Sequence, residues 1–291
     1  MSNLVINLLG PFQVSRNGEL VTDFHSDKVR ALLAYLCLEH AKAHRREKLA
    51  GLLWSDYPQR NALANLRNIL SNLRLVIGDR QPGNAANASP DYLLITRQSV
   101  QFNSDSDAYV DAINLLDILQ TPNASLGALE SAATSYHGEI MSGFSLGESP
   151  LFDEWLLIQR ERFERLILDT LHRLAKLFTS RGLYERALPY AWRQVELDPI
   201  REKAQRQLIR LLAYNGQSSA ALKQLENCRQ VLMDEIGVEP SAETTLLYEQ
   251  IKNGTLSIPD LNSKVLPAFL VEKSDEAVSA LDVSIQASVI N

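Results

Sequence analysis

The sequence predicts a mainly α-helical protein in which a small α+β part precedes an all-α part. Three observations lead to this prediction. Strand-like segments with turn residues occur only before residue 103, helical periodicity dominates from residue 107, and the helical part contains a repeat of 34 residues. The 291 residues suffice for two domains, which we place at 1–103 and 107–254. The Ser-rich segment 255–291 shows no period, and we interpret it as a linker or a disordered tail.

The chain opens with a predicted antiparallel sheet. Residues 4–15 are rich in apolar and β-branched side chains and are interrupted by Gly10 and Pro11. Asn17-Gly18 follows between two apolar runs, and this dipeptide is the strongest short signal for a β-hairpin.

Three helices and a second hairpin are predicted next. Apolar side chains recur at steps of three and four, Ser26 is a plausible N-cap, and Gly78 provides a stop. Two short strands then flank Arg97-Gln98. Three helices followed by a hairpin are the element order of a winged helix-turn-helix. We expect helices at 27–40, 45–54 and 59–77 and strands at 92–96 and 99–102.

The remainder reads as helix almost throughout. Gly182 and Gly216 lie 34 residues apart, as do Ala187 and Ala221, and this period is typical of tetratricopeptide repeats. The predicted fold is therefore an N-terminal winged helix followed by an all-α tetratricopeptide-like helical repeat domain. We expect helices at 107–119, 125–137, 151–180, 183–196, 200–214, 217–236 and 241–252.

Composition and charge exclude several classes of protein. A hydrophobic content of 45% excludes a fully disordered chain, and no apolar run reaches the roughly 18 residues of a membrane span. The N-terminus lacks the features of a secretory signal, so we expect a cytoplasmic protein. The net charge of −6 is uneven: residues 1–103 hold 12 Lys and Arg against 8 Asp and Glu, and the rest hold 17 against 27. This asymmetry suggests two separate tasks, although a solvated mixed surface explains it equally well.

Neither metal binding nor catalysis is indicated. Cys37 and Cys228 lie in unrelated helices and cannot form a zinc site alone. None of the five histidines has the spacing of a metalloprotease motif, and no serine nucleophile elbow occurs. We therefore expect no enzymatic activity, no cofactor and no metal.

The predicted helix 59–77 carries the clearest candidate site. Its apolar residues form a narrow stripe, and the opposite side is rich in asparagine, which is a poor helix former. Asparagine bonds to adenine in the major groove, and small side chains let a helix approach the bases closely. The alternative is an ordinary polar helix face. The stripe comprises Leu63, Leu66, Leu70, Leu73 and Ile77, and the candidate base-reading residues are Asn61, Asn65, Asn68 and Asn72.

Basic residues around this helix are candidates for contacts to the DNA backbone. Arg67 and Arg74 flank the asparagine face, seven residues apart, and would hold phosphates or form ion pairs that support the fold. Lys28, Arg45 and Arg46 are further candidate phosphate contacts. Arg97 at the tip of the second hairpin would enter the minor groove, or would be a simple exposed turn residue.

Several segments resemble one protein family. The N-terminal ones are HSDKVRALLAYLCLEH, REKLAGLLWSDYPQRNALANLRNILSNLR and DYLLITRQSVQFN. They resemble the OmpR-like winged-helix domain of the Streptomyces antibiotic regulatory protein family. Three later segments resemble the bacterial transcriptional activator domain that follows it: YHGEIMSGFSLGESPLFDEWLLIQRERFERL, YERALPYAWRQVELDPIREKAQRQLIRLLA and LMDEIGVEPSAETTLLYEQI.

The resemblance implies a sequence-specific DNA-binding transcriptional activator. Such a protein binds direct repeats near promoters as a homodimer and recruits RNA polymerase through its sigma factor or alpha subunit. The helical domain would dimerise, contact polymerase or sense a regulatory protein. The chain departs from the family where it has Asn72 and Leu75 in place of arginines. The alternative function is a tetratricopeptide-like adaptor whose winged helix binds DNA weakly or is masked by packing on the helical domain.

Overall fold

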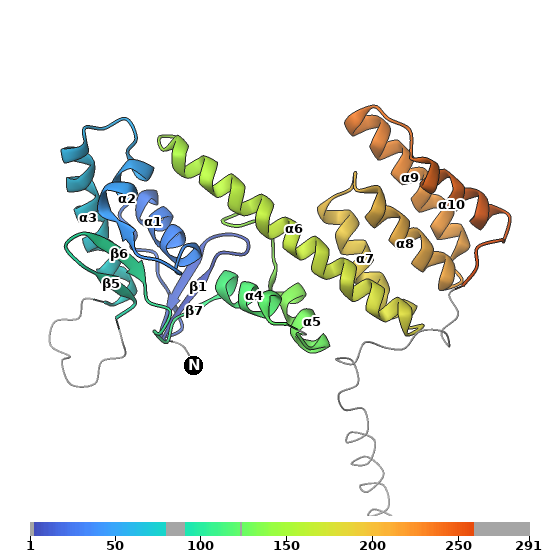
Figure 1. The fold of residues 1–291 in the computed structure, drawn as a ribbon, viewed down its shortest axis with the longest axis horizontal. Coiled ribbons are helices and arrows are strands. Elements are labelled where there is room, and N and C mark those ends of the chain that lie inside the picture. Colours follow the sequence, from blue (N-terminus) through green and yellow to red (C-terminus); the bar gives the residue numbers. More distant parts are fainter. Residues whose placement is uncertain (1–2, 80–90, 123, 259–291) are drawn as a thin grey trace, which may run out of the picture. The chain divides into compact units, whose positions relative to one another are not determined.

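The chain folds as a mainly α-helical protein, as predicted. The computed structural model describes residues 3–79, 91–122 and 124–258, which contain ten helices and seven short strands. The chain divides into two compact units (Figure 1). The N-terminal unit comprises residues 1–120 and 132–167, and the helical unit comprises residues 121–131 and those from 168 onward. The predicted tail from residue 259 lies outside the described residues.

The predicted opening sheet is confirmed, with one additional strand. Asn17 and Gly18 both have positive φ angles, 53° and 85°, as the tight turn between two antiparallel strands requires. The extra strand, β7, pairs parallel to β1 and is only two residues long, too short to show a period in the sequence. The sheet has the order β3-β2-β1-β7 and consists of β1 (Leu4–Asn7), β2 (Gln13–Arg16), β3 (Glu19–Leu20) and β7 (Tyr109–Val110).

The three helices and the second hairpin occur in the predicted order. Figure 1 shows the helices grouped with this hairpin. A short strand before the second helix pairs with the hairpin and completes a three-stranded sheet of order β4-β6-β5. The elements are α1 (Asp27–Leu38), β4 (His44–Arg45), α2 (Arg46–Leu53), α3 (Gln59–Ile77), β5 (Leu93–Ile95) and β6 (Ser99–Phe102). Their apolar side chains form one core, which includes Leu32, Leu36, Leu49, Leu53, Leu66, Leu70, Leu73, Val100 and Phe102.

The segment that leads into the long sixth helix packs on the winged helix. The backbone N–H of Met141 donates to the carbonyl oxygen of Leu8 at 2.8 Å, and the Trp155 ring lies 4.8 Å from that of Tyr35. The N-terminal unit therefore continues beyond residue 107, although a domain boundary at 103–107 remains our prediction from the sequence. The helices of this region are α4 (Asp111–Gln120), α5 (Leu126–Ser135) and α6 (Pro150–Ser180).

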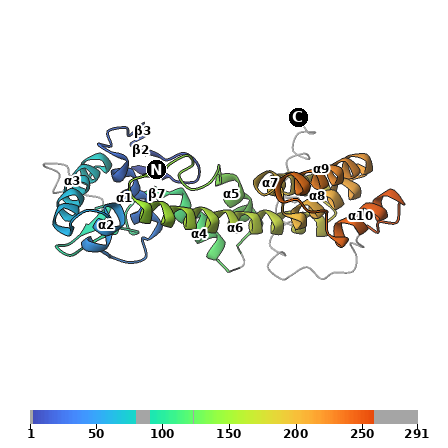
Figure 2. The same cartoon turned by 90° about the horizontal axis from the view of Figure 1, so that it is seen from above.

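The helical unit shows the predicted repeat in its geometry. Gly182 and Gly216 have φ angles of 72° and 75°, and each follows the end of a helix with the same pair of backbone hydrogen bonds. Ala187 and Ala221, also 34 residues apart, are both fully buried. Figures 1 and 2 show the first three helices of this array side by side. The array consists of α7 (Tyr184–Leu197), α8 (Glu202–Tyr214), α9 (Ser218–Ile236) and α10 (Ala242–Lys252).

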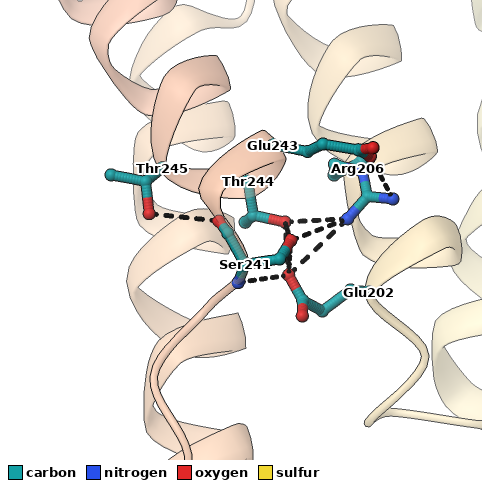
Figure 3. A network of polar contacts seen from close by, with 6 residues as sticks. All are labelled: Glu202, Arg206, Ser241, Glu243, Thr244 and Thr245. Atoms are coloured by element: carbon teal, nitrogen blue, oxygen red, sulfur yellow. Dashed lines mark hydrogen bonds and ion pairs between the residues drawn. The ribbon is translucent and has the colours of Figure 1, made fainter.

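A polar network attaches α10 to α8 (Figure 3). The Glu202 carboxylate accepts hydrogen bonds from the backbone N–H and the hydroxyl of Ser241, at 2.9 and 2.7 Å, and from the Thr244 hydroxyl. Arg206 donates to both hydroxyls and pairs with Glu243 at 2.8 Å. Partial burial acts to raise the pKa of Glu202, but the hydrogen bonds from Ser241 and Thr244 outweigh it and lower that pKa.

Candidate nucleic-acid interface

Helix α3 has one buried and one exposed side. The buried side carries apolar residues spaced by three and four, which fix the helix on α1 and α2. Leu63, predicted to belong to this stripe, is only half-buried. The exposed side presents residues that recur at steps of three, four, three and four, so they form a straight row along the helix. This exposed row comprises Asn61, Ala64, Asn68, Ser71 and Leu75.

Arginines follow one edge of the exposed row. Arg60 and Arg67 are seven residues apart, nearly two full turns, and both are exposed. Arg74 continues the same edge but is half-buried, with its Nε atom buried and without a hydrogen-bond partner among the described residues. Arg60 was not among the predicted contacts, although its seven-residue spacing from Arg67 identifies it. A helix with small and amide side chains beside a basic edge has the chemistry of a major-groove reader.

Asn72 does not lie on the exposed side as expected. Its side chain is 6% exposed, and its Oδ1 atom accepts a hydrogen bond of 3.1 Å from the backbone N–H of His25. Its Nδ2 atom donates to the carbonyl oxygen of Asp23 at 3.5 Å. The expected exposure was wrong because the segment before α1 lies along this edge of α3. Asn72 attaches that segment to the helix, and we leave it out of the base-reading set.

Asn65 occupies the same edge two turns earlier and is half-buried. It lines an open cavity of about 520 Å³ together with Asn68 and Lys28. Residues Ser145, Leu146 and Glu148, from the loop before α6, form the other wall of this cavity. The asparagine edge of α3 thus has a polar cavity beside it, whereas Arg60 and Arg67 on the arginine edge face solvent.

The hairpin turn collects three of the predicted basic residues. Arg97 is exposed in the turn between β5 and β6, as predicted. Arg46 donates from Nε and Nη2 to the carbonyl oxygen of Thr96, at 3.2 and 2.9 Å, and its backbone N–H donates to Gln98. Arg45 is exposed and pairs in register with Ser99. Arg46 therefore holds the turn that presents Arg97, a role that sequence reasoning did not assign to it.

The end of α3 is fastened to the start of the hairpin. The Asp79 carboxylate accepts hydrogen bonds from the backbone N–H groups of Tyr92 and Leu93, at 2.6 and 3.0 Å. Burial raises the pKa of Asp79, and these hydrogen bonds oppose that rise. Arg16 donates to the carbonyl oxygens of Leu75 and Val76, in the last turn of α3. Asp79 thus joins the end of α3 to the hairpin, and Arg16 joins the same end to strand β2 of the opening sheet.

Lys28, another of the predicted cations, is largely enclosed by its neighbours. Its side chain is 15% exposed, and its Nζ atom lies 5.1 Å from the centre of the Trp54 ring and 6.0 Å from that of Tyr57. The same atom is 3.8 Å from the Glu148 carboxylate. Lys28 therefore meets an aromatic surface and a carboxylate on its own chain.

Known proteins resemble both parts of the chain. Residues 117–252 match the family described as bacterial transcriptional activator domain. The chain is 24% identical to the regulatory protein AfsR of Streptomyces coelicolor over 89% of its own length, and 26% identical to the transcriptional regulatory protein MoaR1 of Mycobacterium tuberculosis over 89%. The match over residues 117–252 and these two relatives support a transcriptional regulator of the Streptomyces antibiotic regulatory protein type. The resemblance stated from its segments is thereby confirmed.

The extent of these similarities differs. The chain spans 25% of the length of AfsR and 82% of that of MoaR1. A solved structure of Mycobacterium tuberculosis EmbR in complex with a low affinity phosphopeptide has a similar fold, with a TM-score of 0.61 and 19% sequence identity. The match covers 99% of this chain and 72% of the EmbR chain. This match shows that the two chains share a fold. The relatives are named as regulators and not as enzymes, and none of the helices in the described part of the chain has the length and apolar composition of a membrane span.

Proposed function

We propose that this Streptomyces antibiotic regulatory protein-type chain is a transcriptional activator that binds specific DNA sequences through α3 and the β5–β6 hairpin. The observation that carries the proposal is the exposed row of α3 with an arginine edge beside it. The hairpin adds a second exposed arginine cluster, as the wing of a winged helix does. The exposure of Asn61, Asn68 and Arg67 favours this function over an adaptor whose α3 face is masked.

The side chains divide into two groups by their chemistry. Asn61, Asn65 and Asn68 would read base edges in the major groove, and Ala64 leaves room for close approach. The cations position the protein on the backbone without reading sequence. In this assignment Arg60, Arg67, Arg74, Arg45 and Lys28 hold phosphates, and Arg97 enters the minor groove.

The relatives support a proposal for the wider activity. We infer that two copies bind a direct repeat near a promoter and that the protein recruits RNA polymerase through its sigma factor or alpha subunit. The helical unit offers the surface for dimerisation, for polymerase or for a regulatory protein, because stacked helix pairs present extended binding surfaces. The names of AfsR and MoaR1 as regulatory proteins support this proposal.

The test begins with selection of bound duplexes from a random library at two salt concentrations. Recovery of a direct repeat with half-sites about one helical turn apart supports the proposal. In vitro transcription from a promoter carrying that repeat then tests activation. Weak, salt-sensitive binding to every duplex, with no sequence recovered, would contradict it and favour the adaptor function.

A further inference from the structure

The ammonium group of Lys28 is held in a fixed place beside α3. The rings of Trp54 and Tyr57 lie at cation–π distances from it, and Lys28 lines the same cavity as Asn65 and Asn68. The neighbouring acid, Asp27, is paired with Arg30. Glu148 is therefore the carboxylate that meets Lys28, and the distance between their charged atoms is 3.8 Å.

The loop that carries Glu148 is firmly built. The Asp153 carboxylate accepts hydrogen bonds from the backbone N–H groups of Leu146 and Gly147, both at 2.9 Å. Arg160 donates to the carbonyl oxygens of Ile140, Met141 and Phe144, at 2.7 to 3.0 Å. Five backbone positions between residues 140 and 147 thus have their hydrogen-bond partners on α6, which fixes the backbone of the loop.

The Glu148 side chain itself is free of that framework. It is 82% exposed, so it leaves Lys28 at little cost when another anion arrives. Lys28, in contrast, is held by two rings and has few alternative positions. The arrangement is a fixed cation with an exchangeable anion, next to the helix face that we assign to DNA.

We propose that the Glu148 carboxylate occupies the position of a DNA phosphate at Lys28 and thereby competes with DNA for this cation. The inference rests on the proposed function and adds an intramolecular competitor to it. While Lys28 stays paired with Glu148, it neutralises no phosphate and releases no counterion from the DNA, so it contributes little to affinity in the natural chain. Removal of the Glu148 charge leaves the Lys28 ammonium group without a carboxylate partner. Lys28 can then bind a DNA phosphate, and this contact adds to the affinity for DNA.

The experiment measures the affinity for the selected duplex as a function of salt. The variants are Glu148→Gln, Lys28→Met and the double variant, with Glu154→Gln as the matched control because Glu154 is an exposed carboxylate on α6. We expect Glu148→Gln to bind roughly three- to tenfold more tightly at 0.1 M salt, with a slope of log K against log salt steeper by about 0.9. Lys28→Met should abolish this gain, and Glu154→Gln should show much less of it.

Other results would overturn the inference. An unchanged affinity in Glu148→Gln, while the natural chain binds its duplex, contradicts it and leaves the proposed function intact. A gain that persists with Lys28→Met, or that Glu154→Gln reproduces, indicates general charge repulsion and also contradicts it. If neither the natural chain nor Glu148→Gln selects any duplex, the proposed function fails and this inference fails with it. Matching thermal unfolding curves for all variants verify that each is folded.

Discussion

The side-chain oxygen of Asn72 accepts a hydrogen bond of 3.1 Å from the backbone N–H of His25, 47 residues earlier in the chain. This contact ties the segment before α1 to the recognition-like helix α3. It also separates Asn72 from Asn61 and Asn68, whose side chains are exposed. The asparagines of one helix face therefore have two different tasks, one in the fold and one that we assign to DNA.

Asn72→Ala should destabilise the N-terminal unit without changing base preference. The substitution leaves the N–H of His25 without its acceptor in a part-buried position, which costs about 1–2 kcal/mol. Urea unfolding measures the loss, and repeated selection of duplexes measures the preference. A changed consensus sequence with unchanged stability would show that Asn72 does contact DNA.

Arg67 and Asn68 should affect DNA binding in different ways. Arg67→Ala removes one cation from the arginine edge, so it should weaken binding on all sequences and reduce the salt slope by about 1. Asn68→Ala should mainly relax the preference at one base, by about 1–3 kcal/mol. Affinities for the selected duplex and for single-base variants distinguish the two effects. A uniform loss from both substitutions would contradict this division.

Arg46→Lys should impair binding although the charge is kept. Lysine cannot donate two hydrogen bonds to the Thr96 carbonyl oxygen, and the turn that carries Arg97 loses its anchor. We expect a loss of roughly fivefold, which corresponds to about 1 kcal/mol. Arg45→Lys is the matched control, because the exposed Arg45 needs only its charge to hold a phosphate. If Arg46→Lys and Arg45→Lys bind the duplex with equal affinity, Arg46 contributes only its charge.

Ser149→Ala should destabilise the N-terminal unit. The Ser149 hydroxyl is fully buried and donates to the carbonyl oxygen of Leu53 at 2.8 Å, between the start of α6 and the end of α2. Its removal leaves a buried acceptor unpaired, at a cost of about 1–3 kcal/mol. Ser145→Ala, the same change at an exposed hydroxyl, is the control and should cost less. Urea unfolding checks both, and equal stabilities would refute the expectation.

The attachment of α10 should weaken in acid. The pKa of Glu202 is lower in the folded chain than in the unfolded chain, so the stability from its ionised form is present above the unfolded value. That stability is lost as the pH falls through the folded value, below the usual range of a glutamate. Glu202→Gln should have a lower melting temperature than the natural chain at pH 7. Near pH 3 the melting temperatures of the two proteins should approach each other. A difference that stays constant with pH would show that the carboxylate charge does not matter.

The element order was predictable from the sequence because most elements have strong local signals. Asn17-Gly18 marked the first hairpin, and amphipathic spacing with glycines after the helices marked the helices. Nine of the ten described helices begin and end within about two residues of the predicted positions, and α4 begins four residues later than predicted. The strands β4 and β7, each of two residues, were missed because such short pairs form through tertiary hydrogen bonds and carry no period.

The candidate site was only partly predictable for a similar reason. Helical periodicity identifies the side of α3 that opposes the core, but a distant segment covers part of it. The segment before α1 covers Asn72, and Asn65 is half-buried beside the loop that carries Glu148. No local pattern indicates that Arg46 binds the hairpin turn, because Thr96 lies 50 residues later in the chain. The pairing of Lys28 with Glu148 joins residues 120 positions apart and is equally invisible in the local sequence.

The long helix α6 contributes residues 150–167 to one compact unit and residues 168–180 to the other. The family match begins at residue 117, so the region by which relatives are classified starts within one folding unit and ends in the other. A hybrid protein joined near residue 117 would place the loop and α6 of one parent on the winged helix of another. Exchange of whole regulatory modules between relatives should therefore succeed only when both sides of buried contacts, such as Ser149 with Leu53 and Trp155 with Tyr35, come from the same parent.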